Sequence, residues 1–531
     1  MRNIEIPQQK FILMLHSASN LKGVELPYKT RSLCPECLRI LDAEVYEEDG
    51  KVMIRKFCSE HGEFVELYWG DAEMFKKASR FAVDGRIIQN PITTNTTCPF
   101  SCGLCNNHKS QTALLNIVVT NRCDLACWYC FFYAKRAGYV YEPTIDQIRE
   151  MVRIARNQKP VGCNAVQLTG GEPTLREDIL EIIKVIKEEG YDHIQLNTNG
   201  IRLARDPEFV KKAREFGVNT VYLSFDGLDE TTNPKNHEEV PNILENCRKA
   251  GLGIVLVPTV IKTVNDHQLG AIIRFAAENI DIVRGVNFQP VSLVGSMPKK
   301  EREKYRITIP DCIKAIEEQT NGEISRDDFY PVPSVAPISW FVEALTGEPK
   351  YALTTHFACG MATYVFKEDG KLIPITRFVD VEGLLDYLAR EAENVSKSRL
   401  KKIRALKDVI DLKRFIDLEK APKGFNFNKI LLDVLIKHDY SALGEFHMRS
   451  LFIGFMHFQD LYNYDIARVE KCEIHYATPD GRIIPFCTFN VIPEIYRDKI
   501  QEKYAIPLDE WERKTGKKIK DDIVRVVKRP R

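Results

Sequence analysis

The sequence of 531 residues contains no long apolar run. No stretch reaches the roughly 18 uninterrupted apolar residues that a membrane-spanning helix needs. The first residues, MRNIEIPQQKF, lack the apolar core of a secretory signal peptide. Both absences argue against a membrane span and against export, and they predict a cytoplasmic protein.

Neither sign of charge is in excess. Lys and Arg number 75 against 74 Asp and Glu, which gives a net charge of +1 and no electrostatic basis for nucleic acid as the main partner. Internal repeats and low-complexity tracts are also lacking. A composition of 44% hydrophobic and 28% charged residues is typical of a soluble globular protein. At this length we expect about two or three domains.

Cysteine, by contrast, is abundant, with 15 residues. In a large protein without an export signal, clustered cysteines indicate metal binding or catalysis rather than disulfides. Four groups contain Cys34, Cys37 and Cys58; Cys98, Cys102 and Cys105; Cys123, Cys127 and Cys130; and Cys359, Cys472 and Cys487. The scattered Cys163, Cys247 and Cys312 are of the kind that usually acts as a small buried apolar side chain.

The middle of the chain alternates between strand-like and helical patterns. The expected strands are 114–120, 165–170, 193–200, 220–227, 254–260 and 285–291, and clear helical patterns cover 145–157, 175–190 and 240–251. Such alternation predicts parallel strands with crossover helices, here an α/β fold with a partial (β/α)6 barrel. We expect a Cys-rich metal-binding region over 1–112, the barrel over 113–295, and a mostly helical substrate and auxiliary-cluster domain over 296–531.

The central cysteine motif directly follows the first expected strand. Cys123, Cys127 and Cys130 have the spacing Cys-x3-Cys-x2-Cys. Three thiolates can hold three irons of a [4Fe–4S] cluster and leave the fourth iron open for another ligand. The spacing alone is also compatible with zinc, but in this context it resembles the radical S-adenosylmethionine (SAM) superfamily. In that family the open iron binds the amino and carboxylate groups of SAM.

Polar and glycine-rich motifs follow the later strands, at the barrel edge where active sites lie. The resemblance implies that Glu172 pairs with the amino group of SAM and that Tyr129 contacts its adenine. Turn capping is the alternative role for Asn199, Ser224 and Asp226. The full set of expected SAM-binding residues is Tyr129, Gly170, Gly171, Glu172, Pro173, Asn199, Ser224, Asp226 and Gln289.

The same cysteine spacing occurs a second time at Cys98, Cys102 and Cys105. This copy lacks a preceding apolar strand and its own Gly-Gly-Glu-Pro, so we expect an auxiliary [4Fe–4S] cluster rather than a second SAM site, with zinc as the alternative. Because the segment leads into the first strand, the cluster should lie at the N-terminal end of the barrel and relay electrons. Cys163 is the candidate fourth ligand and His108 the alternative.

Two further groups predict metal sites. Cys34, Cys37, Cys58 and His61 form two short knuckles that suit zinc or a single rubredoxin-like iron. Cys359, Cys472 and Cys487 predict a second auxiliary cluster, and the last two flank a hairpin over 472–487 with a Pro-Asp-Gly turn. Its fourth ligand is left open between His475, His356, Cys312 and none, and the alternative is three buried cysteines without a metal.

The whole set of motifs is similar to the archaeal tetraether lipid synthases, formerly described as methanopterin-related radical SAM methyltransferases. That resemblance implies coupling of unactivated methyl carbons on isoprenoid chains by a 5′-deoxyadenosyl radical and an auxiliary cluster. It also implies an ether phospholipid substrate, peripheral membrane contact and an electron donor such as a ferredoxin. Residues 445–465, rich in Phe, Met, Leu and Tyr, would line a lipid channel or form an ordinary core helix.

Two other functions remain open on the sequence. One is radical methylation of a pterin precursor, which needs a methyl source and a compact pocket with convergent Asp, Asn and backbone donors but no lipid-length channel. The other is a non-catalytic iron–sulfur protein for electron transfer, which would have no need of Gly170, Gly171 and Glu172. The shape of the cavity is the observation that separates the first from lipid coupling.

Overall fold

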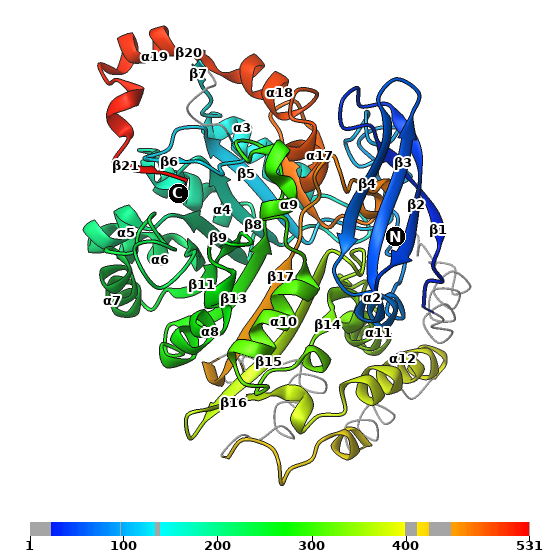
Figure 1. The fold of residues 1–531 in the computed structure, drawn as a ribbon. Helices are drawn as coiled ribbons and strands as arrows, with labels where there is room; N and C mark the ends of the chain where they lie inside the picture. Colours follow the sequence, from blue (N-terminus) through cyan, green and yellow to red (C-terminus); the bar gives the residue numbers. More distant parts are fainter. Residues whose placement is uncertain are drawn as a thin grey trace.

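We describe the fold from a computed structural model, which covers residues 23–529 except 96, 133–137, 399–410, 424–445 and 447. The N-terminal part forms a four-stranded antiparallel sheet of β1 (Tyr28–Leu33), β2 (Ile40–Glu48), β3 (Lys51–Cys58) and β4 (Gly62–Trp69), followed by α2 (Ala72–Ser79). In Figure 1 this blue sheet stands at one side of the molecule. Tyr68 and Thr30 both hydrogen-bond to the Asp465 carboxylate, so the sheet is anchored on the C-terminal part of the chain.

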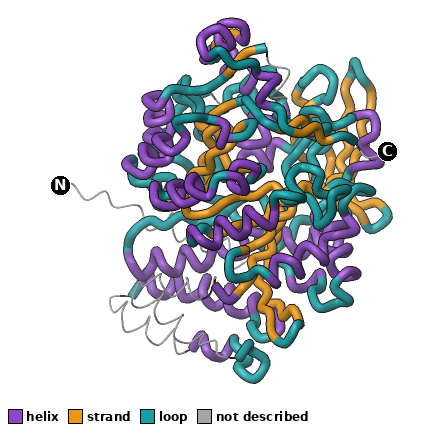
Figure 2. Tube along the Cα trace, turned by 90° about the vertical axis from the view of Figure 1, so that its left-hand side faces the viewer, coloured by secondary structure: helices purple, strands orange, loops and turns teal. Residues whose placement is uncertain are grey.

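The six predicted parallel strands are present in one sheet. They are β5 (Leu114–Thr120), β8 (Ala165–Gly170), β9 (His193–Thr198), β10 (Val218–Ser224), β11 (Gly253–Val257) and β13 (Val283–Pro290), paired in this order. The connecting helices are α3 (Ile145–Arg156), α4 (Ile179–Glu188), α5 (Ile201–Arg205), α6 (Pro207–Phe216), α7 (Val240–Ala250) and α8 (Leu269–Glu278). Figure 2 shows helices packed around the central strands. The α/β fold with a partial barrel is confirmed.

The sheet does not end with the sixth strand. At one edge β17 (Ser450–Met456) pairs parallel with β13, and β15 (Gly360–Glu368), β14 (Tyr330–Pro331) and β16 (Lys371–Pro374) continue outward. At the other edge β18 (Ile474–Ala477) pairs parallel with β5 and forms the predicted hairpin with β19 (Ile483–Pro485). With β12 (Thr259–Val260), which pairs with β13, the sheet has 13 strands. The C-terminal part therefore completes the barrel wall instead of forming a separate helical layer.

The helical interpretation of residues 445–465 is wrong over the part that forms β17. The apolar run SLFIGFM is a strand in the sheet interior, with Leu451, Ile453 and Phe455 all buried. A strand buried on both faces has no alternating pattern, so its continuous apolar run cannot be told from a buried helix by periodicity. Of this stretch, residues 445 and 447 lie outside the described part.

Helices of the C-terminal part pack beside the extended sheet. They are α9 (Arg302–Tyr305), α10 (Ile309–Gln319), α11 (Ala336–Thr346), α12 (Val381–Lys397), α16 (Ile466–Glu470), α17 (Phe486–Val491), α18 (Arg497–Tyr504) and α19 (Leu508–Thr515). The chain then returns to the barrel, where β21 (Arg525–Val527) pairs parallel with β6 (Leu125–Cys127) (Figure 1). A second short pair joins β7 (Tyr139–Val140) to β20 (Ile506–Pro507). The last described residues thus lie on the central cysteine loop.

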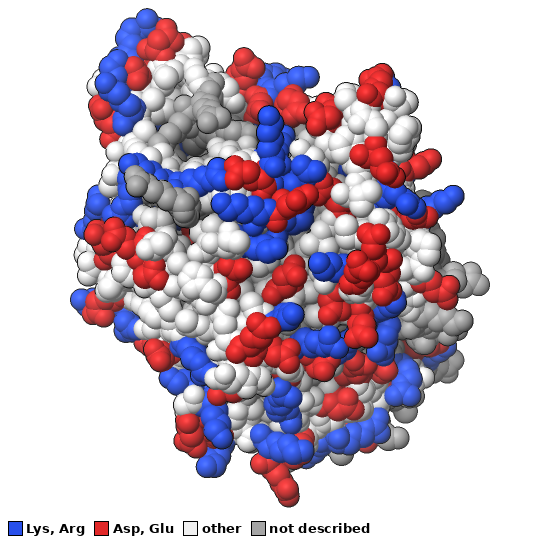
Figure 3. Space-filling model, viewed as in Figure 1, with Lys and Arg blue, Asp and Glu red and all other residues white. Residues whose placement is uncertain are grey.

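The surface agrees with the balanced composition. Basic and acidic side chains are mixed over the face shown in Figure 3, and neither sign forms a continuous patch there. Within the described residues, no helix is both long enough and apolar enough to cross a membrane.

Candidate functional site

A cavity of about 740 Å³ opens at the carboxyl ends of the parallel strands. The central cysteine loop forms one wall, with Cys123, Cys127 and Cys130. Seven of the expected SAM-binding residues line the same space: Tyr129, Gly170, Gly171, Glu172, Asn199, Ser224 and Gln289. Pro173 and Asp226 do not line it. The structure therefore brings the cysteine loop and the strand-end motifs to one place.

The two glycines allow the strand-end motif to pack directly on the loop before Cys123. A Cβ atom on Gly170 would lie 2.1 Å from the Thr120 carbonyl oxygen, and one on Gly171 would lie 2.0 Å from the Arg122 carbonyl oxygen. Backbone hydrogen bonds to these same two oxygens come from Gly171 N (2.9 Å) and Glu172 N (2.7 Å). Any side chain would break this contact, so glycine is required for the two motifs to share one wall.

The Glu172 carboxylate is buried and held from several sides. Its Oε1 accepts hydrogen bonds from Thr174 N (3.0 Å) and Thr198 Oγ1 (2.7 Å), and its Oε2 accepts one from Asn199 N (2.8 Å). Burial and the nearby Asp124 raise the pKa of Glu172 to about 7. These hydrogen-bond partners are neutral donors, so an ammonium group would supply the positive charge that a buried carboxylate needs. Pro173 begins the short turn that presents the Thr174 amide.

Asp226 takes a different position from the one expected. Its Oδ1 accepts a hydrogen bond from Thr259 N (2.9 Å), and its Oδ2 accepts from the Tyr129 hydroxyl and from Lys235 Nζ (2.8 Å). Lys235 Nζ also donates to Ser224 Oγ (2.7 Å). Asp226 thus lies behind the cavity wall and fixes three residues that do line it, Tyr129, Lys235 and Thr259.

The sequence did not identify Lys235 as a residue of the site, although its side chain lines the cavity. It lies in the irregular segment after β10, where a single lysine among polar residues carries no motif. Although burial disfavours its ammonium form, the Asp226 carboxylate keeps the pKa of Lys235 above the usual value. The side chain therefore places a permanent positive charge on the cavity wall, next to Tyr129, whose ring centroid lies 4.8 Å from Nζ.

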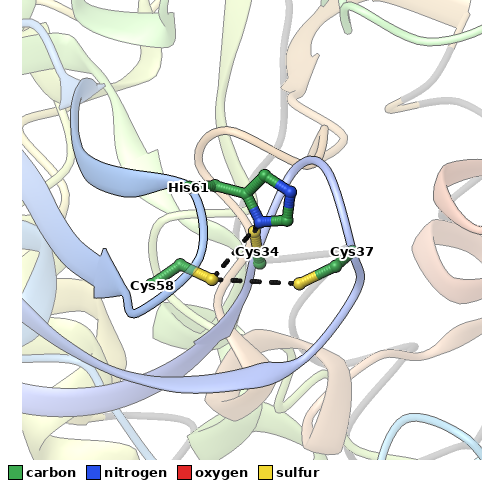
Figure 4. Close-up of side chains that lie close together, drawn as sticks. All are labelled: Cys34, Cys37, Cys58 and His61. Carbon is green, nitrogen blue, oxygen red and sulfur yellow. Dashed lines mark hydrogen bonds between the residues drawn. The ribbon is translucent and has the colours of Figure 1, made fainter.

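The N-terminal knuckles form a compact four-ligand group. The ligand atoms of Cys34, Cys37, Cys58 and His61 all lie within 4.8 Å of one another (Figure 4). His61 Nδ1 is 3.6 Å from the Cys34 sulfur and 3.5 Å from the Cys58 sulfur. Hydrogen bonds from the Glu60 backbone and the His61 ring lower the pKa of Cys58 to about 6, which favours the thiolate that binds a metal. This site fits one tetrahedral metal ion.

Cys98, Cys102 and Cys105 line a second, small cavity together with His108. Cys163 does not reach this cavity. Its sulfur contacts the Ala165 carbonyl oxygen (3.2 Å) in the barrel core, so the proposal of Cys163 as fourth ligand is wrong. Sequence proximity to a strand end did not reveal that this side chain points into the hydrophobic core. His108, the alternative, lines the cavity, and its Nε2 donates to the Cys472 carbonyl oxygen (2.7 Å).

The last cysteine group also comes together. Burial, and after it the neighbouring Cys487 and Cys359, raise the pKa of Cys472. Arg468 Nε donates to the Cys359 sulfur (3.3 Å), and Cys487 lines the main cavity. The group therefore reaches the main cavity through Cys487 alone.

The candidates for a fourth ligand of this group are placed differently. His475 is engaged through both ring nitrogens, with Thr112 Oγ1 at 3.0 Å and the His108 ring at 3.1 Å. His356 is buried and accepts a hydrogen bond from Ala358 N (3.2 Å). Cys312 lies on α10 in the main hydrophobic core, where the neighbouring charges are Asp311 and Asp266, so the structure does not bring it to the group.

Comparisons with known proteins agree with this geometry. Residues 117–276 match the radical SAM superfamily, and residues 26–70 match the HMPTM N-terminal zinc ribbon domain. A 7,8-dihydro-6-hydroxymethylpterin dimethyltransferase of Methanocaldococcus jannaschii is 50% identical over 495 residues, which cover 91% of this chain and 97% of that protein. This chain belongs to the same family.

More distant relatives match a smaller share of this chain. A GTP 3′,8-cyclase of Clostridium acetobutylicum is 30% identical over 237 residues, covering 43% of this chain and 69% of that enzyme. Among solved structures, the radical SAM methyltransferase TsrM of Kitasatospora setae aligns at 12% identity and a TM-score of 0.28 over 74% of this chain and 72% of that chain, a likeness too weak to carry an argument.

Membership of the family makes this chain a radical SAM enzyme that uses SAM and a [4Fe–4S] cluster, with a metal site in its zinc ribbon. The identification as a tetraether lipid synthase is wrong, because the relative that matches almost the whole chain acts on a pterin. The expected ether phospholipid substrate and the expected membrane contact depended on that identification, so they are not supported either. Cysteine spacing indicates where a chain can hold a metal ion or a cluster, and that information does not extend to the substrate.

Proposed function

We propose that this protein is a radical SAM methyltransferase that acts on a pterin of the 7,8-dihydro-6-hydroxymethylpterin type. The observation that carries the proposal is the 50% identity to a pterin dimethyltransferase over 91% of this chain and 97% of that protein. Identity of this extent includes the zinc ribbon, the barrel and the C-terminal part, so it is not limited to the SAM-binding motifs.

The cavity supports the same proposal. Its volume of about 740 Å³ is in the usual range of small-molecule sites and has room for SAM together with a bicyclic ring. Below the SAM-binding end, the barrel interior contributes neutral amide side chains to the wall. They are Asn116, Gln167, Asn197 and Asn287. Amides can donate hydrogen bonds to, and accept them from, a neutral heterocycle with N–H and carbonyl groups.

Cys123, Cys127 and Cys130 hold the SAM-binding [4Fe–4S] cluster. The donor set fits this group, because three cysteines on one loop line the cavity beside the glycine contact that fixes the loop. When bound, the cluster supplies the electron that splits SAM into methionine and the 5′-deoxyadenosyl radical. The chain contributes the orientation of SAM and the exclusion of water.

Two charged side chains bind opposite charges of the methionine part of SAM. Glu172 receives the ammonium group, which relieves the unfavourable burial of its carboxylate. Lys235 faces the SAM carboxylate. Asp226 and Ser224 hold the ammonium group of Lys235 in place. Tyr129 packs against the adenine with its hydroxyl fixed by Asp226. Asn199 and Gln289 complete the polar wall.

The other cysteine groups hold auxiliary metal centres. Cys98, Cys102 and Cys105 with His108 lie apart from the cavity and relay electrons. Of Cys359, Cys472 and Cys487, the last lines the cavity, and this group acts on the substrate side of the reaction. Thr488 joins the two groups, because it follows Cys487 and its Oγ1 is 3.9 Å from the Cys102 sulfur.

The test is methylation of the pterin by anaerobically reconstituted enzyme. Incubation with 7,8-dihydro-6-hydroxymethylpterin, SAM and a reductant should give a product heavier by one or two methyl groups and an amount of 5′-deoxyadenosine in proportion to it. SAM labelled in its methyl group distinguishes SAM from a second one-carbon donor as the methyl source. Steady 5′-deoxyadenosine formation without any methylated pterin, over several donors, would refute the proposal.

A further inference from the structure

Residues 522–529, here called the β21 segment, form part of the wall of the main cavity. The residues of this segment that line the cavity are Val526, Val527, Lys528 and Arg529. The segment lies far from the cysteine loop in sequence, yet β21 runs beside that loop in the fold (Figure 1). Nothing in its sequence resembles a binding motif, so only the tertiary structure brings it to the site.

The backbone of the β21 segment is bonded to the cysteine loop. β21 is in parallel register with β6, so that Val527 stands opposite Cys127. Val524 N donates to the Asp124 carbonyl oxygen (2.7 Å), and Trp128 N donates to the Val527 carbonyl oxygen (3.2 Å). These bonds involve main-chain atoms only, so they are retained when a side chain of the segment is replaced.

The Arg525 side chain joins the same segment to a second wall of the cavity. Its Nη1 donates to the Lys235 carbonyl oxygen (2.5 Å), and Nη1 and Nη2 donate to the two carboxylate oxygens of Glu239, at 3.0 Å each. The Glu239 side chain is only 9% exposed. A bidentate pair that is shielded from water in this way holds its geometry better than an ion pair on the surface.

Lys235 is therefore held through its main chain as well as through its side chain. Its Nζ is fixed by Asp226 and Ser224 at the cavity wall, and its carbonyl oxygen is fixed by Arg525. SAM contacts both elements that Arg525 connects, because the cysteine loop binds it through the cluster and Lys235 faces its carboxylate. The distance between the two elements must therefore be constant for both contacts to form at once.

We propose that Arg525 is a positioning residue of the SAM site, which holds Lys235 at a fixed place relative to the cysteine loop. The inference rests on the placement of Lys235 at the SAM carboxylate under the proposed function. It adds a role for the β21 segment, which connects two walls of the site.

The test is equilibrium dialysis of SAM against the anaerobic holoenzyme without any pterin. Arg525→Met should raise the Kd for SAM by about tenfold. Arg153→Met is the matched control. Arg153 also makes a bidentate pair with a mostly buried carboxylate, that of Glu189, at 2.7 and 3.0 Å, but it lies on α3 outside the cavity, so this variant should bind SAM like the wild type.

A double-mutant cycle separates positioning from general stability. Lys235→Met should itself weaken SAM binding, and adding Arg525→Met to it should change the Kd by less than about twofold, because Arg525 acts through Lys235. A residue that merely stabilised the fold would cost the same factor in both backgrounds. The electron paramagnetic resonance spectrum of the reduced cluster without SAM should be the same in Arg525→Met as in wild type, since the main-chain bonds to the cysteine loop remain.

Arg525→Lys provides a second variant in case Arg525→Met does not fold. Lysine keeps the positive charge but cannot make the planar bidentate contact to Glu239 while it also reaches the Lys235 carbonyl oxygen. This variant should keep the wild-type thermal midpoint and raise the Kd for SAM by about threefold.

The possible failures are distinguishable. Wild-type SAM affinity in Arg525→Met, or in Arg525→Lys if the first variant does not fold, would overturn the inference, as would an additive double-mutant cycle or an equal loss in Arg153→Met. Unchanged SAM affinity in Lys235→Met would overturn the placement of Lys235 and this inference with it. An enzyme that shows the expected SAM affinities but methylates no pterin would overturn only the proposed substrate.

Discussion

The pH dependence of SAM binding offers the sharpest test of the site. Glu172 is 1% exposed, and burial and the neighbouring Asp124 raise its pKa to about 7 in the unliganded protein. The ammonium of SAM binds the carboxylate form and not the neutral acid. SAM binding therefore weakens as pH falls below 7, by a factor approaching ten per pH unit, or about 30-fold at pH 5.5.

Glu172→Gln should remove this dependence. The amide keeps the volume but cannot carry charge, and it turns one acceptor into a donor that faces the Thr174, Thr198 and Asn199 donors. A hydrogen bond to a charged group contributes about 1.5–3 kcal/mol. The variant should bind SAM about 10- to 150-fold more weakly at pH 7.5, with a nearly flat profile down to pH 5.5.

The assay is equilibrium dialysis of SAM against anaerobic holoenzyme between pH 5.5 and 7.5, with each Kd corrected for the fraction of SAM whose α-amino group, with a pKa of about 7.7–8.0, is protonated. Glu473→Gln is the matched control. Glu473 is also buried, and burial raises its pKa to about 7, but it accepts hydrogen bonds from Thr354 and lies outside the cavity. A wild-type affinity that stays constant over this range, or the same loss in Glu473→Gln, would refute the role of Glu172.

Three further outcomes follow from the metal sites. Cys127→Ala should abolish 5′-deoxyadenosine formation in the presence of reductant, and continued formation would disprove the cluster assignment. Cys487→Ser should leave SAM cleavage intact but stop methylation, as measured by mass spectrometry of the pterin; full methylation would show that this group is not needed for the reaction. Cys58→Ser should release the metal of the four-ligand N-terminal group and lower the thermal unfolding midpoint by several degrees. If metal analysis still found this metal bound to the variant, the assignment of the four side chains of Figure 4 as its ligands would be contradicted.

Some errors of the sequence analysis have a common cause. Residues 450–456 form a strand although a helix was expected, and Cys163 lies in the core although a metal site was expected. In both cases the local pattern was compatible with two environments, and long-range packing selected one. β17 lies far from β13 in sequence, yet parallel pairing with it decides the conformation of the whole segment.

Lys235 and Asp226 show the same limit within the site. A strand-end Asp is visible in the sequence, but its place behind the wall depends on Tyr129, Thr259 and Lys235 meeting from three separate segments. No spacing rule connects these residues. The contacts of Asp226 follow from its burial, because a buried carboxylate is stable only when a nearby cation and hydrogen-bond donors compensate its charge.

The sequence by itself determined the metal chemistry and the barrel. Cysteine spacing is a local property, since a loop of eight residues already holds three thiolates, and strand–helix alternation follows from the period of apolar residues along the chain. The tertiary structure alone decided which side chains share the cavity and which cysteine groups touch it. That outcome depends on strands β17 and β18 pairing with β13 and β5 at the two edges of the six parallel strands, because contacts between distant segments have no signature in local spacing.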